Sequence, residues 1–223
     1  MSLIMLLAAG SIAAVLFVGV RDHRAAKAAR RGLLDGCVNA VERPHLTHGG
    51  DGFPHLSGRL LGREVRVDLI PDTMTIRRLP QLWLSTTILD HNAALPRLSV
   101  LVRPAGTEFY SLNARFEHRL DAPHGVPAEV LIRGDAGAER LLAALAETLI
   151  DVLADARIKE IVITERGLRI VRQAGEGKRG EHLLLRQSVF EDAAVARHDL
   201  ATVLDQLQTI RAIASAYGRA RAA

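Results

Sequence analysis

The sequence predicts an α+β protein: an N-terminal transmembrane helix, a mostly antiparallel β section, and then a β-α-β-β-β-α section. Three observations lead to this prediction. Residues 3–20 contain no charged side chain. Residues 56–120 contain several stretches in which apolar and polar residues alternate, which is the period of a half-buried strand. Residues 137–154 and 191–217 repeat apolar residues at spacings of three and four, as amphipathic helices do.

The first segment, residues 3–20, has the length and composition of a membrane-spanning helix. Its one hydroxyl side chain is Ser11. A helix of this length covers roughly 27 Å, close to the thickness of the hydrocarbon layer of a bilayer. A cleaved signal peptide has a basic start and a shorter apolar core, and neither is present here. We therefore expect residues 1–31 to be retained as an anchor with a basic juxtamembrane helix.

The flank at 21–31 predicts the orientation of this anchor. It carries five basic residues and one acidic residue. By the positive-inside rule the short N-terminus lies outside and the long C-terminal part lies in the cytoplasm. Abundant arginine and alanine favour a bacterial source, hence the inner membrane. The flank can serve only to stop transfer, or it can also bind anionic lipid headgroups through Arg21, Arg24, Lys27, Arg30 and Arg31.

The charge balance of the remaining chain argues against nucleic acid as a partner. The flank accounts for a net +4, which equals the formal charge of the whole protein, and only 4% of the residues are aromatic. A phosphate-binding surface needs clustered basic residues, and stacking on bases needs aromatic ones.

The single cysteine, Cys37, excludes an internal disulfide and fits a reducing compartment. We expect it to be an inert thiol.

Residues 32–55 are predicted to be a linker, because the stretch 43–55 holds three glycines and two prolines. A domain then occupies 56–223. Its first strands form a hairpin that turns at 61–63, with one apolar face and one charged face. Two further strands are expected at 82–89 and 98–103, both rich in β-branched residues.

The second half begins with a strand that ends at Gly134. Asp135 is expected to cap a helix over 137–154. A hairpin turning at 165–167 follows. The stretch 174–180 is predicted to be a loop and 181–190 a strand, and a final helix over 191–217 is expected to end at Gly218. The two sections, 56–120 and 128–218, can form two lobes or share one sheet.

Four residues of the glycine-rich stretch can bind metal in principle. Imidazole and carboxylate groups are zinc ligands, and two of the histidines are separated by two residues. The stretch has no cysteine, however, and lacks the His-Glu-x-x-His pattern of metalloproteases. We therefore interpret these residues as solvated loop side chains and predict no metal. They are His45, His48, Asp51 and His55.

No catalytic motif is found, so no catalytic residue and no cofactor is predicted. The stretch 174–180 lacks the spacing and the hydroxyl residue of a phosphate-binding loop, and no Gly-x-Ser-x-Gly sequence occurs. Trp83 is expected in the core or between lobes.

Within the anchor, small residues four apart allow a second helix to approach closely. They are Ala9, Gly10, Ala13 and Ala14.

The function predicted from these features is binding. We expect an accessory or scaffold subunit whose partner is a membrane protein complex or a second copy of the chain. The alternative from a different class is a membrane-associated hydrolase or metal-dependent enzyme that uses the histidine-rich stretch 45–55.

Overall fold

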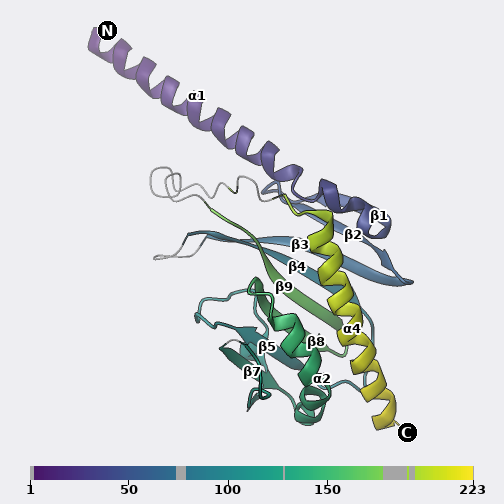
Figure 1. The fold of residues 1–223 in the computed structure, drawn as a ribbon. Helices are drawn as coiled ribbons and strands as arrows, with labels where there is room; N and C mark the ends of the chain where they lie inside the picture. Colours follow the sequence, from purple (N-terminus) through teal and green to yellow (C-terminus); the bar gives the residue numbers. More distant parts are fainter. Residues whose placement is uncertain (1–2, 74–78, 128, 178–189, 191–193, 223) are drawn as a thin grey trace.

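The computed structural model describes residues 3–73, 79–127, 129–177, 190 and 194–222; the side chains of 3–4, 6–9, 23 and 221–222 also lie outside the described set. Within these residues one antiparallel sheet is flanked on one face by two helices, and a long helix projects from the body (Figure 1). The predicted α+β class with a mostly antiparallel sheet is confirmed.

The described helices are α1 (Leu3–Arg31), α2 (Ala138–Leu153) and α4 (Arg197–Ala222), with short 3-10 helices η1 (Asp35–Ala40) and η2 (Asn113–Arg115). The described strands are β1 (Glu42–His48), β2 (Pro54–Leu60), β3 (Arg63–Asp72), β4 (Gln81–Leu89), β5 (Leu98–Val102), β6 (His118–Leu120), β7 (Val130–Gly134), β8 (Ile158–Thr164) and β9 (Gly167–Glu176). Their order across the sheet is β1-β2-β3-β4-β9-β8-β5-β7-β6. Since this is one continuous sheet, the two sections expected from the sequence share it.

The main core lies between this sheet and the helices α2 and α4. The leucines of α2 that recur at three and four positions are buried, and so is the corresponding stripe of α4. In strand β3 of the sheet, buried apolar and exposed polar residues alternate as predicted. Val65 and Val67 are fully buried, whereas Arg66 between them is exposed. Burial of these apolar side chains provides the main free energy of folding, at about 25 cal/mol per Å².

The opposite face of the sheet is covered by residues 103–116, the segment that joins β5 to β6. Its contacts with the sheet include a set of side-chain hydrogen bonds. The Asn113 side-chain amide donates to the hydroxyl of Ser99 on β5 (3.1 Å) and to the carbonyl of Leu131 on β7 (2.9 Å). This second layer is the part of the fold that creates a cavity.

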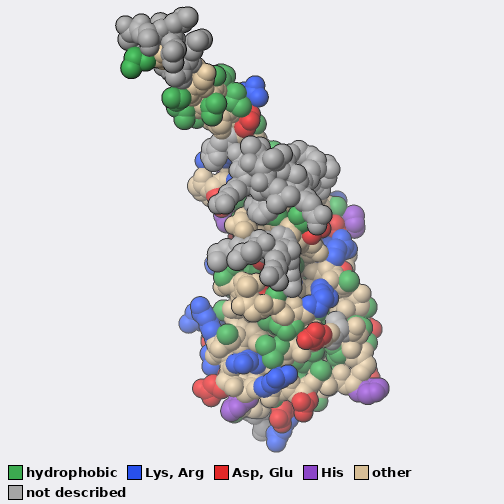
Figure 2. All heavy atoms as spheres, turned by 90° about the vertical axis from the view of Figure 1, so that its left-hand side faces the viewer, with side chains coloured by type: hydrophobic (Ala, Val, Ile, Leu, Met, Phe, Trp, Pro, Cys, Tyr) green, Lys and Arg blue, Asp and Glu red, His purple; other side chains and the backbone are tan. Residues whose placement is uncertain are grey.

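Helix α1 leaves the body and presents its described side chains to the surroundings (Figure 2). Among the described residues, the last turns of α1 contact the domain at the end of β1 and at the turn between β1 and β2. The Arg30 guanidinium lies 5.1 Å from the centre of the Phe53 ring, and His48 Nε2 lies 3.2 Å from the Arg31 carbonyl.

In the part of the chain that the structure describes, no helix has both the length and the apolar composition needed to cross a membrane. The predicted transmembrane helix over 3–20 is thus not supported by this finding. Several of its side chains, those of residues 3–4 and 6–9, fall outside the described residues.

The stretch predicted as a linker at 32–55 contains a strand, which corrects the sequence-based assignment. Residues 42–48 pair with β2 as the edge strand β1. Pro44 is compatible with this position because it lies where the register shifts, between Glu42 and His45. A proline, which has no N–H to donate, is tolerated at such irregularities and on edge strands. Glycine and proline content therefore misled the prediction.

Two predicted helix ends also differ from the structure. Asp135 does not cap α2 with its side chain, because its carboxylate pairs with Arg97; the N-cap position is occupied by Gly137. Gly218 does not end α4, which continues to Ala222. A Cβ atom at Gly218 would lie 2.7 Å from the Asn92 side-chain nitrogen, so this glycine allows close packing rather than termination. The predicted strand 181–190 lies, except for Phe190, outside the described residues.

Candidate functional site

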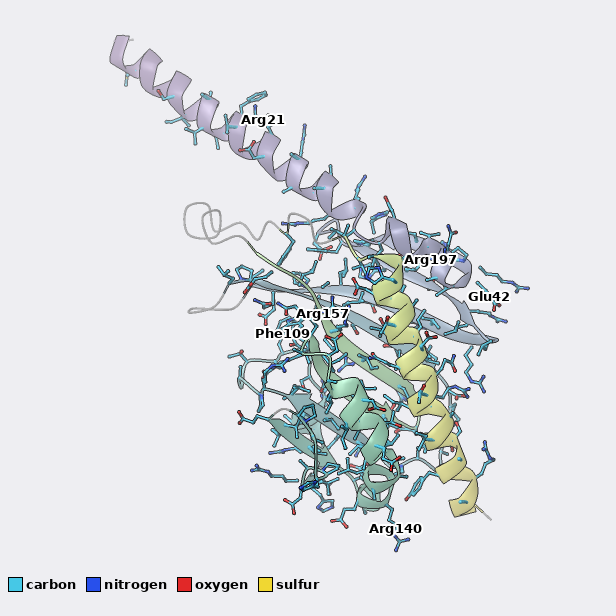
Figure 3. The ribbon with its side chains drawn as sticks, in the orientation of Figure 1. Arg21, Glu42, Phe109, Arg140, Arg157 and Arg197 are labelled. Atoms are coloured by element: carbon cyan, nitrogen blue, oxygen red, sulfur yellow. The ribbon has the colours of Figure 1, made fainter. Side chains whose placement is uncertain are left out.

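A cavity of about 410 Å³ opens between the second face of the sheet and the segment 103–110. Its position can be found in Figure 3 from Phe109 and Arg157, the sequence neighbours of two lining residues. The wall combines side chains from β3, β4, β8 and β9 with this segment. The lining residues are Asp72, Gln81, Trp83, Arg103, Ala105, Thr107, Glu108, Tyr110, Ala156, Lys159 and Gln173.

Two aromatic side chains form one side of this cavity. Trp83 on β4 and Tyr110 pack with their ring centres 5.7 Å apart, and each side chain is only 9% exposed. Val171 of β9 completes this small apolar cluster. Trp83 Nε1 and the Tyr110 hydroxyl are buried and have no hydrogen-bond partner among the described residues. Buried polar groups are usually paired in native proteins, and six further side-chain atoms of the described residues are also buried without a hydrogen-bond partner.

A buried ion pair forms a second side of the cavity. Lys159 Nζ lies 2.8 Å from Glu108 Oε1, and both side chains are less than 10% exposed. The ammonium group also donates to the carbonyls of Val102 (3.0 Å) and Arg103 (2.7 Å). All three donors of the lysine are therefore used. This lysine holds the covering segment in place and is not a free base or nucleophile.

Behind the aromatic pair, Glu160 is a fully buried carboxylate with a complete set of donors. Its oxygens accept from the hydroxyls of Ser99 (3.1 Å) and Ser111 (2.6 Å), and from the Arg169 guanidinium (2.7 Å). The Leu112 amide donates to it as well. A carboxylate with this many partners is a structural group that fastens the segment to β8.

The electrostatics keep the Tyr110 phenol protonated. Burial raises its pKa, and the charges of Glu108, Asp72 and Glu160 raise it further. The phenol can therefore donate a hydrogen bond over the whole physiological range. None of the lining residues is a serine, cysteine or histidine. The cavity wall combines aromatic and charged side chains, without an activated nucleophile beside a base.

The four histidine and aspartate residues considered for metal binding do not converge. His45 and His48 are three positions apart on β1, so their side chains point to opposite faces of the strand. His55 Nδ1 lies 2.7 Å from an Asp68 oxygen, and Asp51 accepts from the Phe53 amide. Within the described ranges, no three His, Cys, Asp or Glu residues are placed to share a metal ion.

Two of the five basic residues at the end of α1 pack against the domain. The aliphatic stem of Lys27 lies against Gly52, and Arg30 lies over the Phe53 ring. Arg21 pairs with Asp22 at 3.2 Å. Arg24 and Arg31 are exposed. Of the proposed lipid-binding set, Lys27 and Arg30 therefore also have a role in fixing the helix to the domain.

The small residues of the anchor are exposed where the structure describes them. A Cβ atom built at Gly10 would meet no heavy atom within 4 Å, and Ala13 and Ala14 are exposed. The side chain of Ala9 lies outside the described residues. These positions are open to a second helix.

Cys37 is buried beneath the residues that precede α4. Burial and the charge of Asp199 raise the pKa of its thiol to about 11, and Sγ contacts the Val195 carbonyl at 3.2 Å. Because the thiolate is the reactive form, this cysteine is inert at neutral pH.

The cavity was not predicted from the sequence. Trp83 was expected in a core or between lobes, and the structure does bury it, but on the second face of the sheet. The sequence signal that could have indicated this position was the alternation in β4. It places the side chains of Trp83 and Ser85 on one face of the sheet and those of Leu82 and Leu84 on the other face.

The chain matches no protein-family model, and a comparison with curated proteins finds no significant similarity.

Proposed function

We propose that this protein is a membrane-attached binding protein. Helix α1 anchors it in a bacterial inner membrane, and the α+β domain docks on a membrane protein complex or on a second copy as an accessory or scaffold subunit. The observation that carries this proposal is the exposure of large apolar side chains along α1.

Met5, Ile12, Val15, Leu16, Phe17, Val18 and Val20 are between 45% and 71% exposed. Successive residues of a helix point about 100° apart, so the run from Val15 to Val18 places apolar groups on all sides. A helix on the surface of its own domain would have one polar face. A helix that is apolar all round is stable when it is buried in lipid or against other helices.

The basic flank supports the orientation. Arg24 and Arg31 lie exposed on the turns between the apolar part of α1 and the domain. Positive residues are retained on the cytoplasmic side, which supports a cytoplasmic domain and an N-terminus outside. Exposed arginines that lie next to a membrane surface also favour contact with anionic headgroups, each by about 1 kcal/mol.

The short connection between α1 and the domain supports a docking role. Arg30 donates to the Asp51 carbonyl (3.3 Å), and the Val195 amide donates to the Leu33 carbonyl (2.9 Å). The last turn of the helix is thus tied to the β1–β2 turn, and the chain just after the helix is tied to the residues that precede α4. Such a tether holds the domain at high effective concentration near a partner in the same membrane, so weak contacts suffice.

Small residues on one side of the helix are the expected contact with a partner helix. Replacing both Gly10 and Ala14 with leucine should reduce co-purification of a membrane partner, because two helices can no longer approach closely. The matched control is Gly19→Leu. Gly19 also has no heavy atom near a built Cβ, and at nine residues from Gly10 it lies on the opposite side of the helix.

The measurement is affinity purification from native membranes in mild detergent, with two differently tagged copies to detect self-association. The double variant should lose its partner or second copy, whereas Gly19→Leu should retain it. The proposal is overturned if the parent chain elutes alone and both variants behave identically.

A further inference from the structure

We propose that the cavity on the second face of the sheet binds a small monocarboxylate with an apolar part. The carboxylate of this ligand lies at the Arg103 guanidinium, and its apolar part lies against the rings of Trp83 and Tyr110. This inference goes beyond the proposed function and does not depend on membrane attachment, because every residue that carries it belongs to the α+β domain.

Arg103 is a cation in the cavity wall without an acidic partner. Among the described residues it forms no ion pair with an aspartate or glutamate. Its Nη2 donates to the carbonyls of Ala156 (2.5 Å) and Ile158 (3.1 Å), which leaves its other N–H groups without a protein acceptor. The side chain is exposed, and so is that of Thr107, whose hydroxyl is a second donor in the wall. Hydrogen bonds between a guanidinium and a carboxylate are roughly twice as strong as neutral ones.

The backbone of Arg103 is held in a strained conformation at the end of β5. Its φ is 46°, in the left-handed region that residues other than glycine rarely adopt. The Arg103 amide donates to the Glu129 carbonyl (2.8 Å), and the Arg103 carbonyl accepts from Lys159 Nζ (2.7 Å). Strained residues of this kind are concentrated at binding and catalytic sites. Here the strained residue places a positive charge beside a cavity.

The other charges of the wall allow an anion to bind at Arg103. Lys159 and Glu108 lie 2.8 Å apart and neutralise each other. The remaining acid, Asp72, is only 7% exposed and lies on β3. Strands β4 and β9 lie between β3 and β8, so three strand spacings, about 14 Å, separate β3 from the strand whose Ile158 holds Arg103. Repulsion from Asp72 over this distance is weak compared with direct contact to the guanidinium, and it disfavours a second negative group farther along the cavity.

The aromatic pair offers apolar surface and no hydrogen bond. Trp83 Nε1 and the Tyr110 hydroxyl are inaccessible, so a ligand cannot bond to them. Trp83 lies on β4, two strand spacings or about 10 Å from β8, which a carboxylate joined to a phenyl group by a short chain can span. The cavity volume of about 410 Å³ lies in the range of small-molecule sites, which is about 300–1,000 Å³.

The single tryptophan makes the test direct, because the only indole fluorophore of the chain lies in the cavity wall. The full chain in nonionic detergent is titrated with phenylbutyrate, with the neutral phenylbutyramide and with the cationic phenylbutylamine. We expect a saturable change in Trp83 emission with the carboxylate at millimolar concentration, and binding about tenfold weaker for the amide and the amine. Added salt should reduce this preference. The proposal is overturned if the carboxylate gives no saturable change, or if the amide or the amine binds as tightly.

A carboxylate beside an apolar group also occurs at the C-terminus of a peptide, so N-acetyl-glycyl-phenylalanine is titrated in parallel. Tighter binding of this dipeptide than of phenylbutyrate assigns the site to a peptide C-terminus. Tighter binding of phenylbutyrate assigns it to a free organic acid. If neither binds more tightly than phenylbutyramide, the inference is wrong.

The variant Arg103→Gln separates a binding role of this arginine from a structural one. It should lower the affinity for phenylbutyrate about tenfold, to that of phenylbutyramide, whereas the amide should bind as it does to the parent. The matched control is Arg119→Gln on β6, which makes the same change in net charge at an exposed residue outside the cavity wall. This control should keep the preference of the parent.

A second variant, Thr107→Asp, keeps the test decisive if Arg103→Gln does not fold. Thr107 is exposed, so the substitution should leave the fold intact while it adds a negative charge to the same wall. It should therefore also abolish the preference for the carboxylate over the amide. Retention of the parent's preference in the folded Arg103 or Thr107 variant, or its loss in Arg119→Gln, would refute the carboxylate site.

Discussion

Glu160 shows at the scale of one residue how the covering segment is held. Replacing it with alanine should lower the free energy of unfolding by about 3–5 kcal/mol, because Arg169 would remain largely buried without its partner. The matched control is Glu64→Ala, which breaks the exposed pair with Arg66 and should change stability by less than about 1 kcal/mol. Urea unfolding of the two variants checks this difference. Equal losses would mean that the Glu160 network contributes no more than a surface pair.

Glu108 makes part of the stability depend on pH. Burial alone would raise the pKa of this carboxyl, but the Lys159 ammonium and the Ala105 amide outweigh burial and lower it below the ordinary 4.5. A lowered pKa in the folded state means that the unfolded state binds the proton more readily. The stabilisation is therefore present above pH 4.5 and is lost as the pH falls below it.

The variant Glu108→Gln cannot titrate, so its difference in unfolding free energy from the parent should shrink on acidification. Urea unfolding at neutral pH and at several values below 4.5 measures this difference. A constant difference across the series would exclude the ion pair as a source of the pH dependence.

Among the elements, the turn between β1 and β2 fixes the end of α1. Gly52 has a positive φ of 88°, and a Cβ there would lie 2.7 Å from Lys27 Cγ and 3.1 Å from the Lys27 carbonyl oxygen. Gly62 has a similar φ of 79° but no heavy atom nearby. Gly62→Ala should therefore cost only the backbone strain, about 1–2 kcal/mol. Gly52→Ala should cost more and should loosen the helix.

Urea unfolding compares the stability of these two glycine variants. Limited proteolysis between α1 and η1 reports whether the helix has been released. If Gly62→Ala and Gly52→Ala are equally stable and equally resistant, the contact between Lys27 and the turn does not hold the helix.

The elements that the sequence predicted well are those with a strong local period. The leucine stripe of α2 and the hairpin of β8 and β9 follow from spacing alone. Strand β1 was missed because its proline and the neighbouring glycines resemble a loop, and its pairing depends on β2. The cavity could not be predicted either. It requires the segment 103–116 to fold over the sheet, and the contacts responsible, such as Glu108 with Lys159, join residues far apart in the chain.

For the whole molecule, the proposed function requires that the domain lies in the cytoplasm. A reporter that is active only outside the cytoplasm, fused after Ala223, should give no signal, because a basic flank is expected to stay on the cytoplasmic side. Strong reporter activity would reverse the orientation, and the proposed partner would then have to be sought on the other side of the membrane.

The membrane attachment of the intact chain is the central claim, and alkaline extraction of isolated membranes tests it most directly. We predict that the full-length protein stays in the pellet. A variant with Ile12, Leu16, Phe17 and Val20 changed to serine should move to the supernatant, because the exposed apolar surface of α1 that favours burial in lipid is lost. Release of the unaltered full-length chain into the supernatant, together with the variant, would contradict the account.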